Sequence, residues 1–180
     1  ILTINGDIQS IPDNSFTNCT SLNKIRFNTN SLKSIGISAF ENCSSLSEIS
    51  IGSSIEIVNS NAFLGIKKLI IKGEIQKIPD NTFQNCSSLT NIIFQTNKLT
   101  SFGASVFEGC TSLIEITFPS SIENIYGNAF LGIKELTING DIQYIPSNSF
   151  KDCKSLTKII LNTNQLTTIK TSAFSGCSSL

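Results

Sequence analysis

A chain of 180 residues with 13 basic and 13 acidic side chains carries no formal net charge, and only 14% of its residues are charged. That balance does not indicate a nucleic acid or an anionic membrane as a partner, because both select clustered basic residues. No apolar stretch approaches the ~20 residues that a membrane helix needs, and without histidine the chain has neither a Ser-His-Asp nor a Cys-His catalytic pair.

The first long element, SFTNCTSLNKIRF at 15–27, recurs at 39–51, 82–94, 106–118 and 149–161, and begins again at 173. Its Phe returns at steps of 24, 23 and 20 residues, and the three steps together repeat with a period of 67, so that Phe16 returns as Phe83 and Phe150. Such self-similarity is typical of solenoids, whose units bury their apolar edges only against neighbours. We therefore predict a single solenoid over 1–180, with nearly eight units of 20, 23 or 24 residues.

Each unit contains the pattern apolar-x-x-apolar-x-apolar, whose last three positions alternate as in a half-buried strand. Stacking one strand per unit is predicted to bury one ladder of side chains: Ile4, Phe27, Ile51, Ile71, Phe94, Phe118, Ile138 and Leu161. Turn residues follow at 5–6, 28–30, 52–54, 119–121, 139–140 and 162–164. A second apolar pair, such as Ile8 and Ile11, then precedes a Phe-x-x-Cys segment that we predict to be a short helical or 3₁₀ turn on the convex side.

The third unit of each 67-residue period is shorter than the others. FLGI stands there in place of FTNCTSL, which deletes three residues including the Cys. The strand pattern then resumes as Ile66, Leu69 and Ile71. We therefore predict that the shortened segment is an outer connection and that the strand after it stacks in register.

Between Ile35 and Ile51 the chain resembles the BspA-type leucine-rich repeat. The residues that match its consensus are Ile35, Gly36, Ala39, Phe40, Cys43, Leu46, Ile49 and Ile51, and the stretch from Phe107 to Pro119 matches equally closely. The resemblance covers essentially the whole chain; the departures are the short third unit and Asn or Gln in place of a Pro after the strand. It implies a right-handed α/β solenoid with one short parallel strand per repeat. It also implies kinship with surface-associated proteins of bacteria and protist parasites that are implicated in adhesion.

The six cysteines form three pairs, 19/43, 86/110 and 153/177, with the members of each pair one unit apart. A zinc site would need closer ligand spacing, so no metal is predicted. A disulfide within a pair lies at the limit of the ~7 Å that its Cα atoms allow. We favour the alternative, a column of free thiols packed as small apolar groups.

Three glycosylation sequons occur, at Asn18, Asn42 and Asn85. They would accept glycans in a secreted protein. The equivalent positions elsewhere are Gly109, Asp152 and Gly176. Because Gly or Asp replaces Asn in these units, we interpret the position as a polar turn residue and the sequons as a by-product of the repeat. Carboxylates such as Glu48 and Glu115 are expected in stacked rows rather than across a cleft, so neither an enzyme nor a cofactor is predicted.

The exposed face of the strand ladder is the predicted functional surface. Lys24, Glu48 and Lys68 are predicted to alternate in sign across adjacent strands, which supports a sheet. Ile70 and Ile93 are predicted to be adjacent and solvent-facing without a structural reason to be apolar, and so to centre a contact patch. The candidate binding surface comprises Lys24, Arg26, Glu48, Lys68, Ile70, Asn91, Ile93, Glu115, Thr117, Lys158 and Ile160.

The resemblance, together with the lack of catalytic groups, predicts a non-enzymatic module for protein–protein recognition or adhesion. The predicted location is a cell surface or the extracellular space, and the predicted partners are host matrix proteins, cell-surface proteins or further copies of the chain. The alternatives are a self-assembling structural scaffold such as a filament or coat, and a cytoplasmic interaction scaffold. Because the chain has no Met and opens within a strand pattern, we expect it to be a fragment of a longer array.

Overall fold

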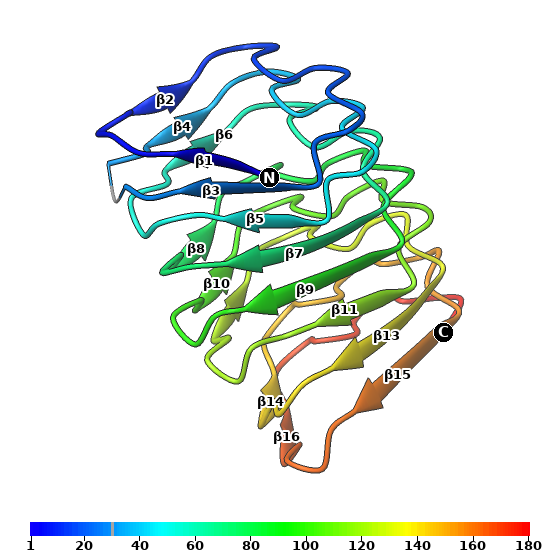
Figure 1. Ribbon diagram of the computed structural model, residues 1–180. Coiled ribbons are helices and arrows are strands. Elements are labelled where there is room, and N and C mark those ends of the chain that lie inside the picture. The colour runs from blue at the N-terminus through cyan, green and yellow to red at the C-terminus, as the bar shows by residue number, and fades with distance from the viewer. Residues whose placement is uncertain (30) are drawn as a thin grey trace.

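The computed structural model describes residues 1–29 and 31–180 as a stack of coils in which strands of successive units lie side by side (Figure 1). Each coil adds one strand to an eight-stranded parallel sheet, here called the ladder. Its strands are β1 (Leu2–Ile4), β3 (Lys24–Phe27), β5 (Glu48–Ser50), β7 (Lys68–Lys72), β9 (Asn91–Gln95), β11 (Glu115–Thr117), β13 (Glu135–Asn139) and β15 (Lys158–Asn162). The predicted turn at 28–30 lies partly outside the described residues.

Each coil has a second strand, so the prediction of one strand per unit is wrong. These two-residue strands are β2 (Ser10–Ile11), β4 (Ser34–Ile35), β6 (Ile57–Val58), β8 (Lys77–Ile78), β10 (Ser101–Phe102), β12 (Asn124–Ile125), β14 (Tyr144–Ile145) and β16 (Thr168–Ile169). Only the second residue of each predicted apolar pair, such as Ile11 after Ile8, lies in the strand. The segment is therefore too short to show the alternation from which strands are recognised.

The described residues contain no helix, so the predicted helical or 3₁₀ turn at the Phe-x-x-Cys segment is also wrong. Asn14 and Asn18 take φ of 57° and 61°, and every later coil repeats these two positive angles. Left-handed residues interrupt a right-handed helix. Instead, the N–H of Phe16 donates to the carbonyl of Ala39 in the next coil at 2.8 Å, and that of Asn18 to Glu41 at 2.9 Å. Most outer segments are thus hydrogen-bonded to the next coil, whereas, among the described residues, 61–65 and 128–132 donate no backbone hydrogen bond to the coil that follows.

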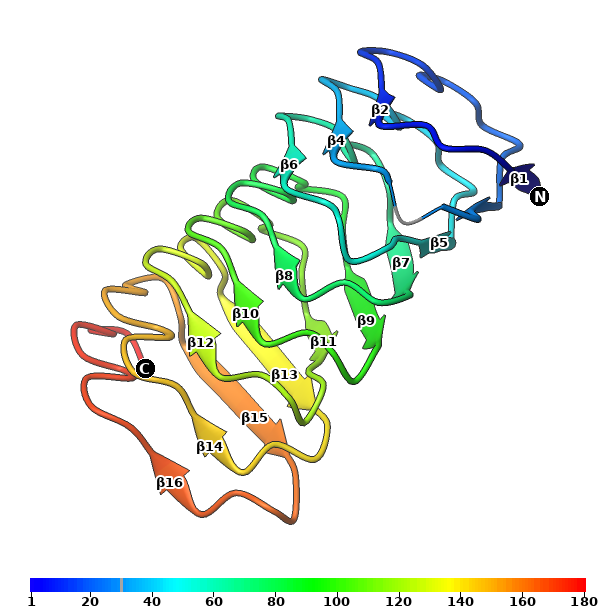
Figure 2. The same cartoon turned by 90° about the vertical axis from the view of Figure 1, so that its left-hand side faces the viewer.

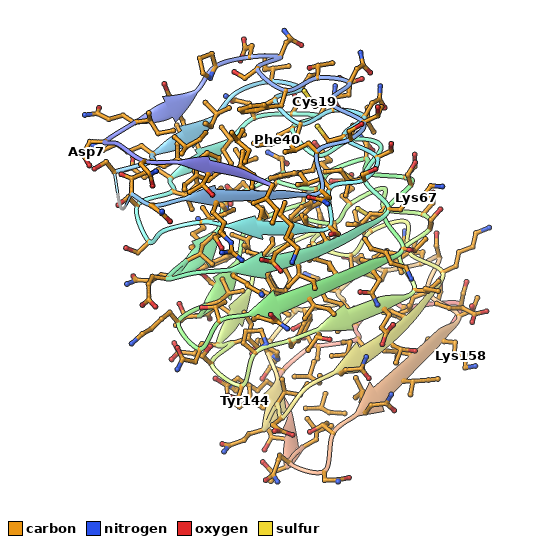
Figure 3. The ribbon with its side chains drawn as sticks, viewed as in Figure 1. Asp7, Cys19, Phe40, Lys67, Tyr144 and Lys158 are labelled. Atoms are coloured by element: carbon orange, nitrogen blue, oxygen red, sulfur yellow. The ribbon has the colours of Figure 1, made fainter. Side chains whose placement is uncertain are left out.

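One core runs the length of the stack, and a column of phenylalanines marks it. The ring of Phe16 stacks on Phe40 with a centroid distance of 5.2 Å, and the column continues through every later coil to Phe174. Phe40 lies between the ladder and the outer segments (Figure 3) and is fully buried. Each coil therefore closes the apolar edge of its neighbours.

The ladder does not stack in the predicted register after the short unit. Glu48 lies opposite Ile70 rather than Lys68, so β7 has slipped along β5 by two residues. The same slip separates β13 from β11. Because side chains alternate with a period of two, an even slip keeps inward residues inward, and Leu69 and Ile71 are both buried.

Glycines at 73 and 140 make the slip possible. The slip brings the carbonyl of Ile51 to the place that a Cβ of residue 73 would occupy, and the carbonyl of Phe118 to the same place at residue 140. Both glycines also have a positive φ, of 111° and 126°. Gly6 has a similar φ of 135° but lies in the first coil, where no preceding strand faces it, and no atom lies within 4 Å of its would-be Cβ. A side chain at 73 or 140 would therefore meet backbone as well as an unfavourable φ.

The second sheet is interrupted after every third coil. Its strands form separate groups, β2-β4-β6, β8-β10-β12 and β14-β16, which Figure 2 shows on the side away from the ladder. At each break stands Pro79 or Pro146. In the intact groups the equivalent residue donates its N–H to the preceding coil, as Gly103 does to the carbonyl of Ile78 at 2.9 Å. Proline lacks that N–H, so the hydrogen bond to the preceding coil is missing at each break.

Candidate functional site

All eleven residues of the predicted binding surface lie on the ladder strands, from Lys24 on β3 to Ile160 on β15. The structure gathers seven of them into two separate groups, one of Lys24, Arg26 and Glu48 and one of Asn91, Glu115, Lys158 and Ile160. Lys68 and Thr117 belong to neither group. Ile70 lies directly opposite Ile93 between these groups. Both isoleucines lie on the outward face of their strands and are half-buried there. Their part in binding stays a prediction.

The first group, the Glu48 cluster, consists of Glu48, Lys24, Arg26 and Lys72. Glu48 is only 5% exposed, which contradicts its predicted place on an open row. Its carboxylate lies 3.0 Å from Nζ of Lys72, 3.3 Å from Nζ of Lys24 and 3.7 Å from the guanidinium of Arg26. Lys68, the predicted partner, makes no ion pair with Glu48 because the register slip moves Lys72 next to Glu48.

The cations keep Glu48 ionised. The hydrogen bond from Lys72 holds the pKa of the Glu48 carboxyl below its ordinary value, against the opposing effect of burial, and Lys24 acts in the same direction. Each of the three cationic side chains remains more than a third exposed, while the carboxylate beneath them is not. The Glu48 cluster therefore presents positive charge to solvent over a buried negative charge.

Glu115 occupies the equivalent position one 67-residue period later, with different neighbours. Asn91 donates its side-chain N–H to Glu115 Oε2 at 2.5 Å, and Asn139 donates to Oε1 at 2.6 Å. These asparagines stand where Lys24 and Lys72 stand in the first period. The two carboxylates are thus satisfied by cations in one period and by amides in the next, so the local charge around the equivalent carboxylate differs between the two periods.

An apolar depression of about 370 Å³ adjoins Glu115 on the ladder face. It is lined by Ile114, Glu115, Glu135, Leu136, Thr137, Lys158 and Ile160. Ile114 is 60% exposed and Ile160 is 39% exposed, and Figure 3 shows Lys158 projecting outward at the start of β15. The two exposed isoleucines can bury apolar groups of a partner protein. The charged side chains at the rim, Glu115, Glu135 and Lys158, can pair with polar groups of the same partner.

Sequence reasoning missed Ile114, although a signal was present. The residue that precedes the ladder strand is polar in every other complete unit: Asn23, Ser47, Lys67, Thr90, Lys134 and Thr157. Figure 3 shows one of these positions, Lys67, pointing into solvent at the edge of the ladder. An isoleucine in that column departs from the polar residue type of the other units, so comparing equivalent positions across units would have found it.

The cysteines form no disulfide in the described residues. In each predicted pair the second thiol donates to the carbonyl of a Phe in the preceding coil, as Cys43 does to Phe16 at 3.0 Å and Cys110 to Phe83 at 2.9 Å. Burial raises the pKa of the Cys43 thiol to about 11 and that of Cys86 to about 12. The described part of the chain also contains no group of three or more potential metal ligands. The buried thiols therefore have packing roles, whereas Cys19 in the first coil is exposed, contrary to the prediction of a fully packed column.

The sequon asparagines lie at a left-handed backbone position. Asn18, Asn42 and Asn85 have φ between 56° and 61°, and the equivalent Gly109 and Asp152 have φ of 74° and 58°. Asn, Asp and Gly are the residues that tolerate this conformation best. The conformational requirement accounts for the Asn in each sequon.

A model of the BspA-type leucine-rich repeat region matches residues 1–97 and 76–180, with 6 copies of the repeat. The chain belongs to the BspA-type leucine-rich repeat family. Proteins with these repeats typically mediate protein–protein interactions and are typically not enzymes. The described residues of this family member include no helix that could cross a membrane.

Among curated proteins, keratocan of Mus musculus is 28% identical over 170 residues, a match that covers 90% of this chain and 48% of keratocan. The chain thus spans about half the length of the curated relatives it matches. Two solved leucine-rich repeat proteins are also similar. That of T. pallidum has a TM-score of 0.47 and 21% identity, covering 96% of this chain and 72% of its own. That of Bacteroides ovatus has a TM-score of 0.37 and 20% identity, covering 99% and 73%.

Proposed function

We propose that this chain is a non-enzymatic adhesion module, located at a cell surface, that binds proteins of a host matrix or of other cells through its ladder face. The observation that carries the proposal is the apolar depression around Ile114 and Ile160. Ile114 interrupts a column of polar residues and is 60% exposed, and it shares the depression with Ile160 of β15, the last strand of the ladder. Such positions are explained by a partner that covers them.

The shape of the ladder supports a multivalent mode of binding. The rows of outward side chains continue over eight strands, and successive strands rotate steadily from β1 to β15 (Figure 1). A rigid face of this length offers several modest contacts to one partner, and contacts on one scaffold combine through a high effective concentration. The affinity would then be spread along the ladder, with the depression as its most apolar part.

The decisive experiment measures binding of the purified chain to immobilised extracellular-matrix proteins and to intact cells. Ile114→Ser combined with Ile160→Thr should weaken binding about tenfold, because central apolar contacts carry much of the energy of an interface. The matched control is Ile57→Thr, which removes a similarly exposed isoleucine from β6 in the second sheet. Equal weakening by the control, or no weakening by the double variant, would refute the proposal.

The cellular location needs its own measurement. Antibodies against the full-length protein should label intact, unpermeabilised cells. Labelling only after permeabilisation would contradict a surface role and would favour the alternative of an interaction scaffold inside the cell.

A further inference from the structure

The Glu48 cluster differs from every other part of the ladder face. Three exposed cations converge on one carboxylate, which leaves the four residues of the cluster with an excess of two positive charges. In addition, Glu48 Oε1 is buried and accepts no hydrogen bond from the described residues, with only the Arg26 guanidinium 3.7 Å away. Buried carboxylate oxygens normally have a donor. The cluster therefore combines several donors that face solvent with one acceptor that lacks a donor.

We propose that the Glu48 cluster binds a side-chain carboxylate of an acidic, partly apolar segment of a partner protein, an inference that rests on the proposed function. Arg26 is the most exposed of the three cations. Its planar guanidinium matches a carboxylate with two parallel hydrogen bonds. Lys24 and Lys72 flank the site and add positive charge, while the buried Glu48 carboxylate holds the three cations together.

The surroundings of the cluster favour a peptide over a polyanion. Glu48 lies opposite Ile70, which lies opposite Ile93, so the charged site borders two half-buried isoleucines. The basic residues also do not extend from β7 onto β9, because the equivalents of Lys24 and Arg26 one period later are Asn91 and Ile93. A sulfated glycan or nucleic acid carries evenly spaced charges and needs a longer basic track. One anionic group next to apolar groups fits the site better.

The probe is a fluorescein-labelled hexapeptide of alternating glutamate and leucine, and its binding to the folded chain is followed by fluorescence anisotropy. The same peptide with glutamine in place of glutamate should not bind. Arg26→Gln and Lys72→Gln should each weaken binding of the acidic peptide about tenfold, as expected for a desolvated charge contact. Lys68→Gln removes the same charge from β7 outside the cluster and should change the affinity less than about twofold.

Three outcomes would overturn the inference: no binding of the acidic peptide, equal weakening by Lys68→Gln, or equally tight binding of a heparin oligosaccharide. These outcomes are separable from failure of the proposed function. If the acidic peptide does not bind while Ile114→Ser with Ile160→Thr still weakens adhesion, only the site at Glu48 is wrong. If the acidic peptide binds but Ile114→Ser with Ile160→Thr leaves adhesion unchanged, the adhesion proposal fails instead.

The internal repeat also allows a gain-of-function test. Asn91→Lys, Ile93→Arg and Asn139→Lys would rebuild the same cluster around Glu115. This triple variant should bind two acidic peptides per chain instead of one, measured by titration calorimetry after circular dichroism has confirmed its fold. A folded triple variant that still binds one peptide would contradict the claim that these four positions make the site. If the variant does not fold, the Arg26→Gln and Lys72→Gln affinities decide.

Discussion

At the scale of single residues, Glu48 and Glu115 show how one position of a repeat is satisfied in two ways. Both carboxylates lie on the ladder face at equivalent positions, yet lysines and an arginine surround Glu48 while two asparagine amides bind Glu115. A buried charge is costly unless it is paired or hydrogen-bonded. The residues next to the carboxylate can therefore differ between periods only if they supply cations or hydrogen-bond donors. Whether they are cations or neutral amides sets the local charge of the surface.

The thiols provide a prediction at the same scale. Cys19 is exposed and Cys177 is half-buried, whereas Cys43, Cys86, Cys110 and Cys153 are buried. With Ellman's reagent at mildly alkaline pH, Cys19 should react first and Cys177 more slowly. The other four should react only on unfolding, because burial suppresses both access and thiolate formation. Rapid reaction of all six in the folded chain, or fewer than six thiols after unfolding, would contradict this.

The same thiols make stability depend on alkaline pH. Burial raises the pKa of Cys43 to about 11 and of Cys86 and Cys153 to about 12, so the folded chain keeps protons that the unfolded chain releases. This stabilisation is complete below the ordinary thiol pKa of about 8.5 and is lost as the pH rises from there to about 12. Urea midpoints should fall over that range, and less steeply in Cys86→Ala.

At the scale of elements, the three glycines one period apart test the register slip. Gly73→Ala should destabilise the chain by about 2 kcal/mol or more, since its Cβ meets the carbonyl of Ile51 at a strained φ. Gly6→Ala is the matched control, because Gly6 has a similar φ but open space around it. Chemical denaturation measures both. Equal losses for the two variants would mean that backbone strain alone, and not the slipped strand, requires glycine.

The ladder strands were predictable because apolar alternation and an unequal but strict spacing of units both point to them. The second strands were not, because two residues such as Ser10 and Ile11 are too few to alternate. The outer turns were misread as helical. Their Asn and Ser residues carry positive φ, and those residue types also occur at helix ends. The partner of Glu48 was misassigned for a related reason, since the even slip leaves the apolar pattern unchanged and reveals itself only through Gly73.

At the scale of the whole molecule, each coil contacts only the coils beside it, so damage should stay local. Phe107 is fully buried and its ring contacts those of Phe83, Phe94, Phe102 and Phe130. Phe107→Ala should cost about 3–5 kcal/mol and separate the stack into two weakly coupled halves.

Hydrogen exchange followed by mass spectrometry checks this directly. In Phe107→Ala the coils before β8 should keep most of their amide protection, while β9 to β13 lose theirs. The control is Phe174→Ala, which removes a half-buried ring from the last described coil. Uniform loss of protection along the whole chain in Phe107→Ala would show that the stack unfolds as one cooperative unit.

The two-residue slip has a consequence for how a long partner must lie on this protein. Residues that are equivalent in sequence, such as Glu48 and Glu115, are separated by one slipped strand pair and so do not share a straight row across the strands. A partner with its own regular spacing would have to cross the strands obliquely to meet both. Duplicating the 67-residue period therefore lengthens the protein and, at the same time, turns a repeated sequence into a diagonal track of contact points.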